Sequence, residues 1–213
     1  MSVYGHIQRS LALLLISTGA FAASELDVRI TPSNSALKAN IEGYVGSLDG
    51  RDAQSLRRLR RIAESEADKA AQALGYYQAR IRSRIEEGET PRLVLEVEPG
   101  ERVRLRHVDI RIEGPASELP AFRIPNASRL QPGSVLNHGR YEDAKRLIQN
   151  QASRYGFFDG RFTRQSLQVD PAAGVADIEL VFASGPRYNL GDLSFSGDFP
   201  FDDDLLRRMV PFE

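Results

Sequence analysis

The stretch Ala71-Gln-Ala-Leu-Gly-Tyr-Tyr-Gln-Ala-Arg80 returns later in the chain as Ala152-Ser-Arg-Tyr-Gly-Phe-Phe-Asp-Gly-Arg161. Both copies place an alanine, a large apolar residue, a glycine, two aromatic residues, a small residue and an arginine at the same spacing. Glycine adopts the left-handed conformation that ends a helix at little cost, and aromatic residues favour strands. The two stretches therefore predict the same helix-to-strand corner in two copies of one folding unit.

A second pair of similar stretches sets the length of the repeat. Val97-Glu-Pro-Gly-Glu-Arg102 aligns with Phe182-Ala-Ser-Gly-Pro-Arg187, and the two glycines lie 85 residues apart. Similarity at a fixed period indicates tandem units. We therefore predict one unit at residues 24–99, a second at residues 100–185, and the beginning of an incomplete third at residues 186–213.

Within the first unit, the pattern of apolar residues predicts a strand, two helices and two further strands. Alternation predicts the first strand at residues 26–30, and spacings of three and four predict a helix that buries Leu37, Ile41 and Tyr44. A longer helix ends at Gly75, and the strands Gln78–Glu86 and 93–97 follow. Its apolar face comprises Leu56, Leu59, Ile62, Ala63, Ala67, Ala70, Ala71 and Leu74. The predicted fold class is α+β, in the order βααββ, with a three-stranded mixed sheet covered by two helices on one face.

The second unit repeats this order with a shorter first helix. Residues 103–112 form a predicted strand that ends at Gly114-Pro115. Pro120, Pro125 and Pro132 then break the segment 115–136 and leave room only for a short helix around 118–123. Asn137 is a predicted N-cap for a helix that ends at Gly156, and strands follow at residues 161–169 and around 178–182. In the third unit we expect a strand through Leu190, Leu193 and Phe195, followed by a helix at 203–209.

The N-terminus differs from the rest of the chain. Leu11–Ile16 forms a short apolar core after Arg9, and Ala20-Phe-Ala22 has the small residues of a cleavage site. Because a membrane-spanning helix needs about 20 apolar residues, we predict a secretory signal peptide at residues 1–22, cut after Ala22 or Ala23. The alternative is a buried N-terminal helix. The chain has no cysteine and a net charge of −1, which excludes disulfide and zinc–thiolate scaffolds and a strong field for nucleic acid.

Few residues carry patterns typical of catalysis or metal binding. Beyond the signal peptide, His107 falls in a predicted strand and His138 at a predicted helix start, and we interpret both as surface or capping residues. The run of three acids at 202–204 is either a metal site or, as we favour, a helix N-cap. The basic run at 57–61 either contacts phosphate or forms a solvated face, with Leu59 and Ile62 directed inward. We predict no catalytic residue, no metal ligand and no cofactor.

An exported chain of βααββ repeats, each with a helix-ending glycine and an aromatic pair, resembles the POTRA domains of the Omp85 superfamily. The passage from Val169 to Gly197 is most similar to the TamA type within that superfamily. The resemblance implies POTRA domains in the periplasm followed by a barrel in the outer membrane, so we expect the chain to be a piece of a longer protein. It assigns a structural role to the six residues of the repeat signature: Gly75, Tyr76, Tyr77, Gly156, Phe157 and Phe158.

The resemblance also places the second strand of each unit at a sheet edge, where unpaired backbone groups can accept an extended peptide. The candidate partner-binding residues on these two strands are Arg80, Ile81, Arg82, Ser83, Arg84, Ile85, Arg161, Phe162, Thr163 and Arg164. The interleaved arginines have two interpretations. In the first, they protect the edge strand against aggregation. In the second, they favour the binding of acidic or unfolded clients.

By this resemblance the chain assists the insertion of outer-membrane proteins, including autotransporters, from the periplasmic side of the outer membrane. Its expected partners are unfolded clients and a TamB-like protein anchored in the inner membrane. One alternative is the POTRA region of a BamA-like insertase or of a two-partner-secretion transporter, which the number of repeats before the barrel would distinguish. Another is a periplasmic scaffold protein held by an uncleaved N-terminal segment.

Overall fold

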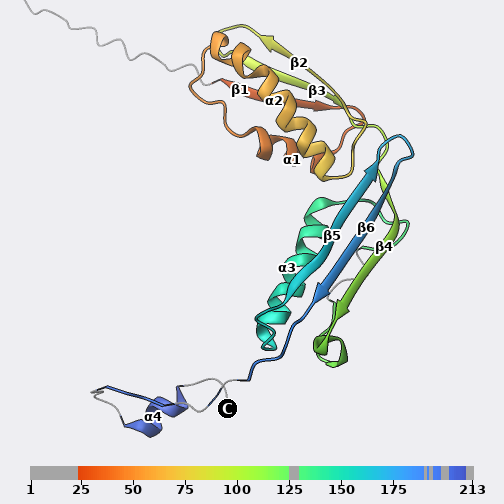
Figure 1. The fold of residues 1–213 in the computed structure, drawn as a ribbon. Coiled ribbons are helices and arrows are strands. Elements are labelled where there is room, and N and C mark those ends of the chain that lie inside the picture. Colours follow the sequence, from red (N-terminus) through yellow and green to blue (C-terminus); the bar gives the residue numbers. More distant parts are fainter. Residues whose placement is uncertain (1–23, 125–129, 190, 192–193, 198–201, 210–213) are drawn as a thin grey trace, which may run out of the picture. The chain divides into compact units, whose positions relative to one another are not determined.

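A computed structural model describes residues 24–124, 130–189, 191, 194–197 and 202–209. The chain divides into two compact units between Glu101 and Arg102. Each unit is a three-stranded mixed sheet with helices, as the sequence predicts (Figure 1). The predicted signal peptide lies outside the described residues. Within the described part of the chain, no helix combines the length and apolar character needed to cross a membrane.

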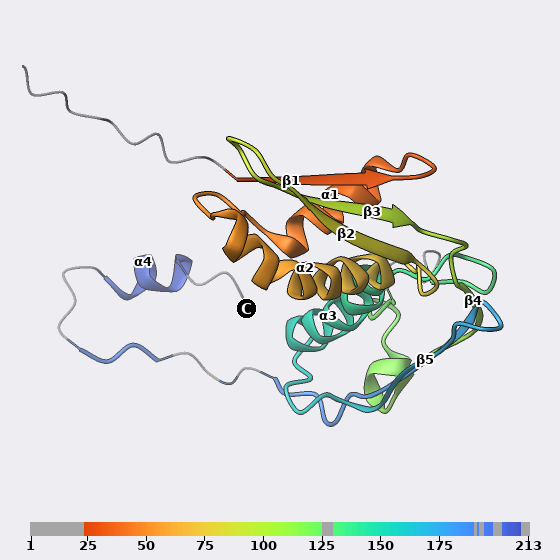
Figure 2. The ribbon, with the colours of Figure 1, turned by 90° about the horizontal axis from the view of Figure 1, so that it is seen from above.

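The first unit contains all five predicted elements. They are β1 (Glu25–Ile30), α1 (Ser35–Val45), α2 (Ala53–Ala73), β2 (Arg80–Glu86) and β3 (Arg92–Glu98). The sheet order is β1-β3-β2, with β1 parallel and β2 antiparallel to the central strand β3. Both helices lie on the same face of this sheet (Figure 2). The second strand of the unit is therefore an edge strand, as the family resemblance implies.

The helix-to-strand corner of the repeat signature is a Schellman motif in both units. In the first, the amide of Gly75 donates to the carbonyl of Gln72 and that of Tyr76 to Ala71. In the second, the amide of Phe157 donates to Ala152 in the same way, 2.8 Å away. This motif brings the residue after the glycine against the third residue from the helix end. The signature therefore places an alanine beneath the first aromatic ring.

The core of the first unit lies between the sheet and the two helices, and it is centred on Leu37, Ile41 and Leu56. Two predicted core residues are outside it: Tyr44 is 45% exposed and Ile62 is 58% exposed. The buried residues of α2 are Leu56 and four alanines, and Ile62 lies outside this stripe. Tyr44 lies near the end of α1, whose buried residues are Leu37 and Ile41.

The second unit follows the same plan around a longer sheet. Its elements are β4 (Arg104–Glu113), the 3₁₀ turn η1 (Pro115–Glu118), α3 (His138–Arg154), β5 (Arg161–Asp170) and β6 (Val175–Ala183). The order is β4-β6-β5, with β4 parallel and β5 antiparallel to β6. The short helix predicted around 118–123 is wrong. A 3₁₀ turn starts at Pro115 instead, because proline suits a first helical position and Pro120 prevents continuation.

After the last strand of the second sheet, the described residues contain the helix α4 (Asp203–Arg208). Asp202 caps it by accepting from the amide of Leu205 at 2.7 Å, which confirms the capping interpretation of the acidic run. The expected strand is absent at residues 191 and 194–197, and Leu190 and Leu193 lie outside the described residues. In both complete units the first strand pairs with the last strand, and among the described residues no strand follows Phe195. A third unit remains a prediction.

Candidate functional site

The strand β2 forms one edge of the first sheet over its full length. Its antiparallel register with β3 runs without interruption from Arg80 opposite Glu98 to Glu86 opposite Arg92. In an antiparallel edge strand, alternate residues direct their backbone N–H and C=O groups away from the sheet. A regular row of peptide groups is therefore available along this edge.

The side chains of β2 alternate between two different environments. Arg80, Arg82 and Arg84 are exposed on the face of the sheet that the helices leave open. Ile81 and Ile85 face the helices and pack against the core, and the hydroxyl of Ser83 between them donates to Glu64 of α2. The strand thus presents a basic row on one side and a mainly apolar row on the other.

The three arginines of β2 differ in their ion pairs. Arg84 lies 3.2 Å from Glu96 and 2.6 Å from Glu86, and Arg80 is 3.9 Å from Glu98. Arg82 forms no ion pair with any described residue, although it sits opposite Glu96 in the register. Exposed pairs of this kind stabilise a fold by about 0–1 kcal/mol, so these arginines are weakly engaged by their own sheet.

The corresponding edge in the second unit is less regular. The register of β5 with β6 shifts between Phe162 and Arg164, so Thr163 occupies a bulge and its hydroxyl donates to the carbonyl of Val181. Phe162 is partly buried, and its ring packs edge-on against Phe182 of the core at 5.1 Å. Arg164 pairs with Glu179 at 2.9 Å. The ten predicted site residues thus lie on two edges, one in each unit.

The opposite edge of the second sheet is partly covered by its own chain. Backbone bonds join Leu105 to Gly133 and Ser134, and Leu136 to Val103, at 2.6–2.9 Å. These bonds extend the sheet beside the start of β4, where they occupy peptide groups that a partner would need. Of the two edges of the second sheet, the edge formed by β5 is therefore more accessible than the start of β4.

A cluster of charged residues on the open face of the second sheet was not predicted. Arg106 and His107 both reach Asp177, at 3.0 Å from Arg106 Nε and 3.0 Å from His107 Nδ1. The register shift between Leu105 and His107 allows two consecutive side chains to contact one carboxylate. The hydrogen bond from Arg106 holds the pKa of Asp177 well below its usual range, and His107 contributes in the same direction. Sequence reasoning missed this cluster because its members are about 70 residues apart.

We expect Asp177→Asn to destabilise the second unit at neutral pH and to make its stability less dependent on acid. A carboxylate with a depressed folded-state pKa stabilises the fold above its unfolded pKa, and this contribution is lost as pH falls toward the folded value. The difference in melting temperature between the wild type and the variant should therefore narrow below about pH 4. Thermal unfolding followed from neutral pH to pH 2 tests this, and a constant difference would contradict it.

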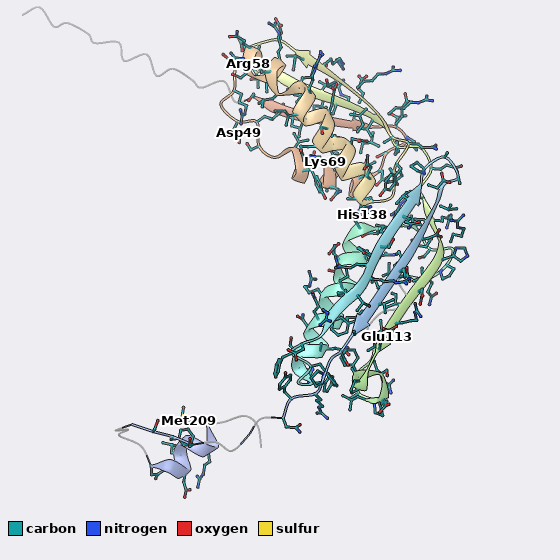
Figure 3. All side chains as sticks on the ribbon, viewed as in Figure 1. Asp49, Arg58, Lys69, Glu113, His138 and Met209 are labelled. Carbon is teal, nitrogen blue, oxygen red and sulfur yellow. The ribbon has the colours of Figure 1, made fainter. Side chains whose placement is uncertain are left out.

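The remaining sequence candidates occupy ordinary surface or capping positions. His107 is exposed, and His138 is the first residue of α3, directly after the N-cap Asn137 (Figure 3). Burial lowers the pKa of His138. The described residues contain no group of three or more side chains suited to a metal ion. In the basic run, Arg57 pairs with Glu87, while Arg58 is exposed near the start of α2 (Figure 3).

The repeat signature holds the segment that leaves the second unit. The amide of Tyr188 donates to the carbonyl of Gly156 at 2.7 Å, and its hydroxyl donates to Asp159 at 2.7 Å. Arg187 donates to the carbonyl of Tyr155, and the rings of Tyr188 and Phe158 lie 5.9 Å apart. The first aromatic residue of the signature thus packs in the core, while the second contacts the outgoing chain.

Comparison with known proteins identifies two matching regions. Residues 27–99 match a family model described as POTRA domain TamA domain 1, and residues 107–183 match the POTRA model described as surface antigen variable number repeat. Among solved structures, the chain is similar to POTRA3-5 of BamA from Haemophilus influenzae, with 17% identity, a TM-score of 0.48, and coverage of 90% of this chain and 77% of that one. It is also similar to POTRA1-2 of the periplasmic domain of Omp85 from Anabaena, with 20% identity, a TM-score of 0.37, and coverage of 78% and 96%.

Proposed function

The chain carries two tandem POTRA domains of the Omp85 family, the first of the TamA type, and from this premise we propose that it binds extended segments of outer-membrane proteins and assists their insertion. The clients would include autotransporters. The domains would act on the periplasmic side of the outer membrane, as a binding module without covalent chemistry.

One observation carries this proposal: in both units the strand after the signature corner lies at a sheet edge. Unpaired peptide groups on such an edge bind an extended chain by strand addition, and the backbone bonds formed do not depend on the client's sequence. A binding mode of this type suits unfolded clients that share a β-strand pattern. The uninterrupted register of β2 makes the edge of the first unit the better of the two candidates.

We further propose that the first unit docks a periplasmic segment of an inner-membrane-anchored partner of the TamB type. The match of residues 27–99 to a TamA first domain supports this choice of partner. Docking at β2 would use the same backbone groups as client binding, so partner and client would compete for one edge.

Proline substitutions within β2 test the role of the edge. Of two neighbouring residues in an edge strand, one directs its N–H outward and the other toward the sheet. Arg82→Pro and Ser83→Pro therefore form a matched pair. The variant that loses the N–H pointing away from the sheet should stay folded and lose binding, whereas the other variant loses a hydrogen bond to β3. Binding of the mature chain to a periplasmic TamB segment and to an unfolded outer-membrane client is measured by titration calorimetry, with folding checked by circular dichroism.

Two outcomes would contradict the proposal. If the folded wild-type chain binds neither probe, the docking and client roles fail together. If the folded proline variant binds both probes as tightly as the wild type, the binding surface is not the β2 edge.

A further inference from the structure

A strand that pairs with the outer edge of β2 would have a different chemical environment on each of its two faces. On the open face, a bound strand would place alternate side chains beside Arg80, Arg82 and Arg84. On the helix face, its other side chains would lie beside Ile81 and Ile85. Side chains on neighbouring strands interact most strongly when they are directly opposite, so this edge favours one pattern of residues.

The strand already paired with the inner side of β2 has this pattern in the part that lies opposite Arg80 and Arg82. On the open face, β3 presents Glu96 and Glu98, which pair with Arg84 and Arg80. The same face also carries Val94 opposite Arg84 and Arg92 opposite Glu86. On the helix face it presents Leu93, Leu95 and Val97, all buried in the core. Beside Arg80 and Arg82, β2 therefore accepts carboxylates from this neighbour on the open face and aliphatic groups on the helix face.

The second sheet pairs its strands in the same way. Its central strand alternates Asp177 and Glu179 on the open face with Ile178 and Leu180 in the core. Arginines of the strands on both sides reach these carboxylates: Arg164 from β5, and Arg106 from β4. In both sheets, arginines of an edge strand thus pair with carboxylates of the central strand.

We propose that the β2 edge selects strands that alternate acidic and aliphatic residues, with the carboxylates on the open face beside the three arginines. This inference rests on the proposed strand addition and adds a client class to it. Arg82 is the central contact, because it is exposed and has no ion-pair partner among the described residues. A guanidinium presents several N–H donors in a planar fork, so Arg80 and Arg84 can bind a second carboxylate while keeping the first.

The helix face adds a restriction on the same strand. Ser83 lies between the two isoleucines and donates to the carboxylate of Glu64. An acidic residue of the bound strand at this place would lie close to that carboxylate, and like charges repel. A strand in the wrong register, with its acids toward the helices, is therefore disfavoured on both faces.

The test uses short synthetic peptides with the mature chain. One peptide alternates valine and glutamate, one alternates valine and lysine, and one has the composition of the first with its alternation broken. A fourth is the valine–glutamate peptide with N-methyl groups on the amides of one edge. Binding is measured by fluorescence anisotropy with the wild type, with Arg82→Glu, and with Arg58→Glu, which makes the same charge change at an exposed position on α2.

We expect the valine–glutamate peptide to bind at least about tenfold more tightly than the lysine and scrambled peptides. Arg82→Glu should reduce or reverse that preference, whereas Arg58→Glu should preserve it, and backbone amide exchange must show both variants folded. Equal binding of the glutamate and lysine peptides would overturn the selectivity while leaving strand addition intact. If N-methylation does not weaken binding, or no peptide binds, strand addition itself fails.

Discussion

Phe157→Ala is expected to lower the free energy of unfolding of the second unit by about 3–5 kcal/mol. The ring is almost fully buried and packs with Phe122, Ile148 and Phe182 in the core. Its removal loses this apolar burial and leaves a cavity beside Ala152, where the Schellman motif fixes the backbone and limits collapse. Native-state exchange of the β6 amides measures the loss in this unit alone.

Phe158→Ala is the matched control, because it changes the adjacent residue to the same side chain. Phe158 is 61% exposed and contacts the ring of Tyr188. We expect its loss to cost less than about 1 kcal/mol. Similar losses in the two variants would contradict the division of the aromatic pair into one core residue and one residue for the outgoing chain.

Gly156→Ala is expected to cost about 2 kcal/mol or more, and to release the segment that leaves the second unit. The residue has a φ of 83°, a conformation that costs other residues roughly 1–2 kcal/mol. In addition, a methyl group at this position would collide with the backbone carbonyl of Tyr188. Relief of that collision requires Tyr188 to move, which breaks its bonds to Gly156 and Asp159.

Gly174→Ala separates the two contributions. Gly174 has a φ of 67°, but a methyl group there would meet no atom within 4 Å. This variant should show the conformational cost alone, while only Gly156→Ala should accelerate tryptic cleavage after Arg187. Equal cleavage rates in the two variants would show that the segment is held by other contacts.

The predictable part of this fold is the part determined by local contacts. The glycine, the alanine five residues before the first aromatic ring, and that ring together specify a Schellman corner, and the sequence contains all three twice. The starts of two helices were also predictable from the sequence, because the side chains of Asn137 and Asp202 accept hydrogen bonds from amides three residues later. By contrast, the exposure of Ile62 depends on which residues of α2 the sheet and α1 cover, and the spacing of apolar residues alone does not determine the edge of that stripe.

The candidate site was predictable in its position but not in its detail. The alternating arginines of β2 could be identified from the sequence, and the resemblance placed them at an edge. Which of them has a carboxylate partner depends on the register with β3, and only the structure shows that Arg82 has none among the described residues. The contact of Arg106 with Asp177 depends on a register shift in the same way, since a bulge of one residue has no clear sequence pattern.

The bonds of Tyr188 have a mechanical consequence. The chain leaves the second unit from β6, which lies at the centre of its sheet between β4 and β5. Because Tyr188 is fastened to the corner at Gly156 and Asp159, a pull on the downstream chain is resisted there first. Force applied to the downstream chain would therefore enter the domain through the end of α3, and the hydrogen bonds of the central strand would stay intact until these bonds break.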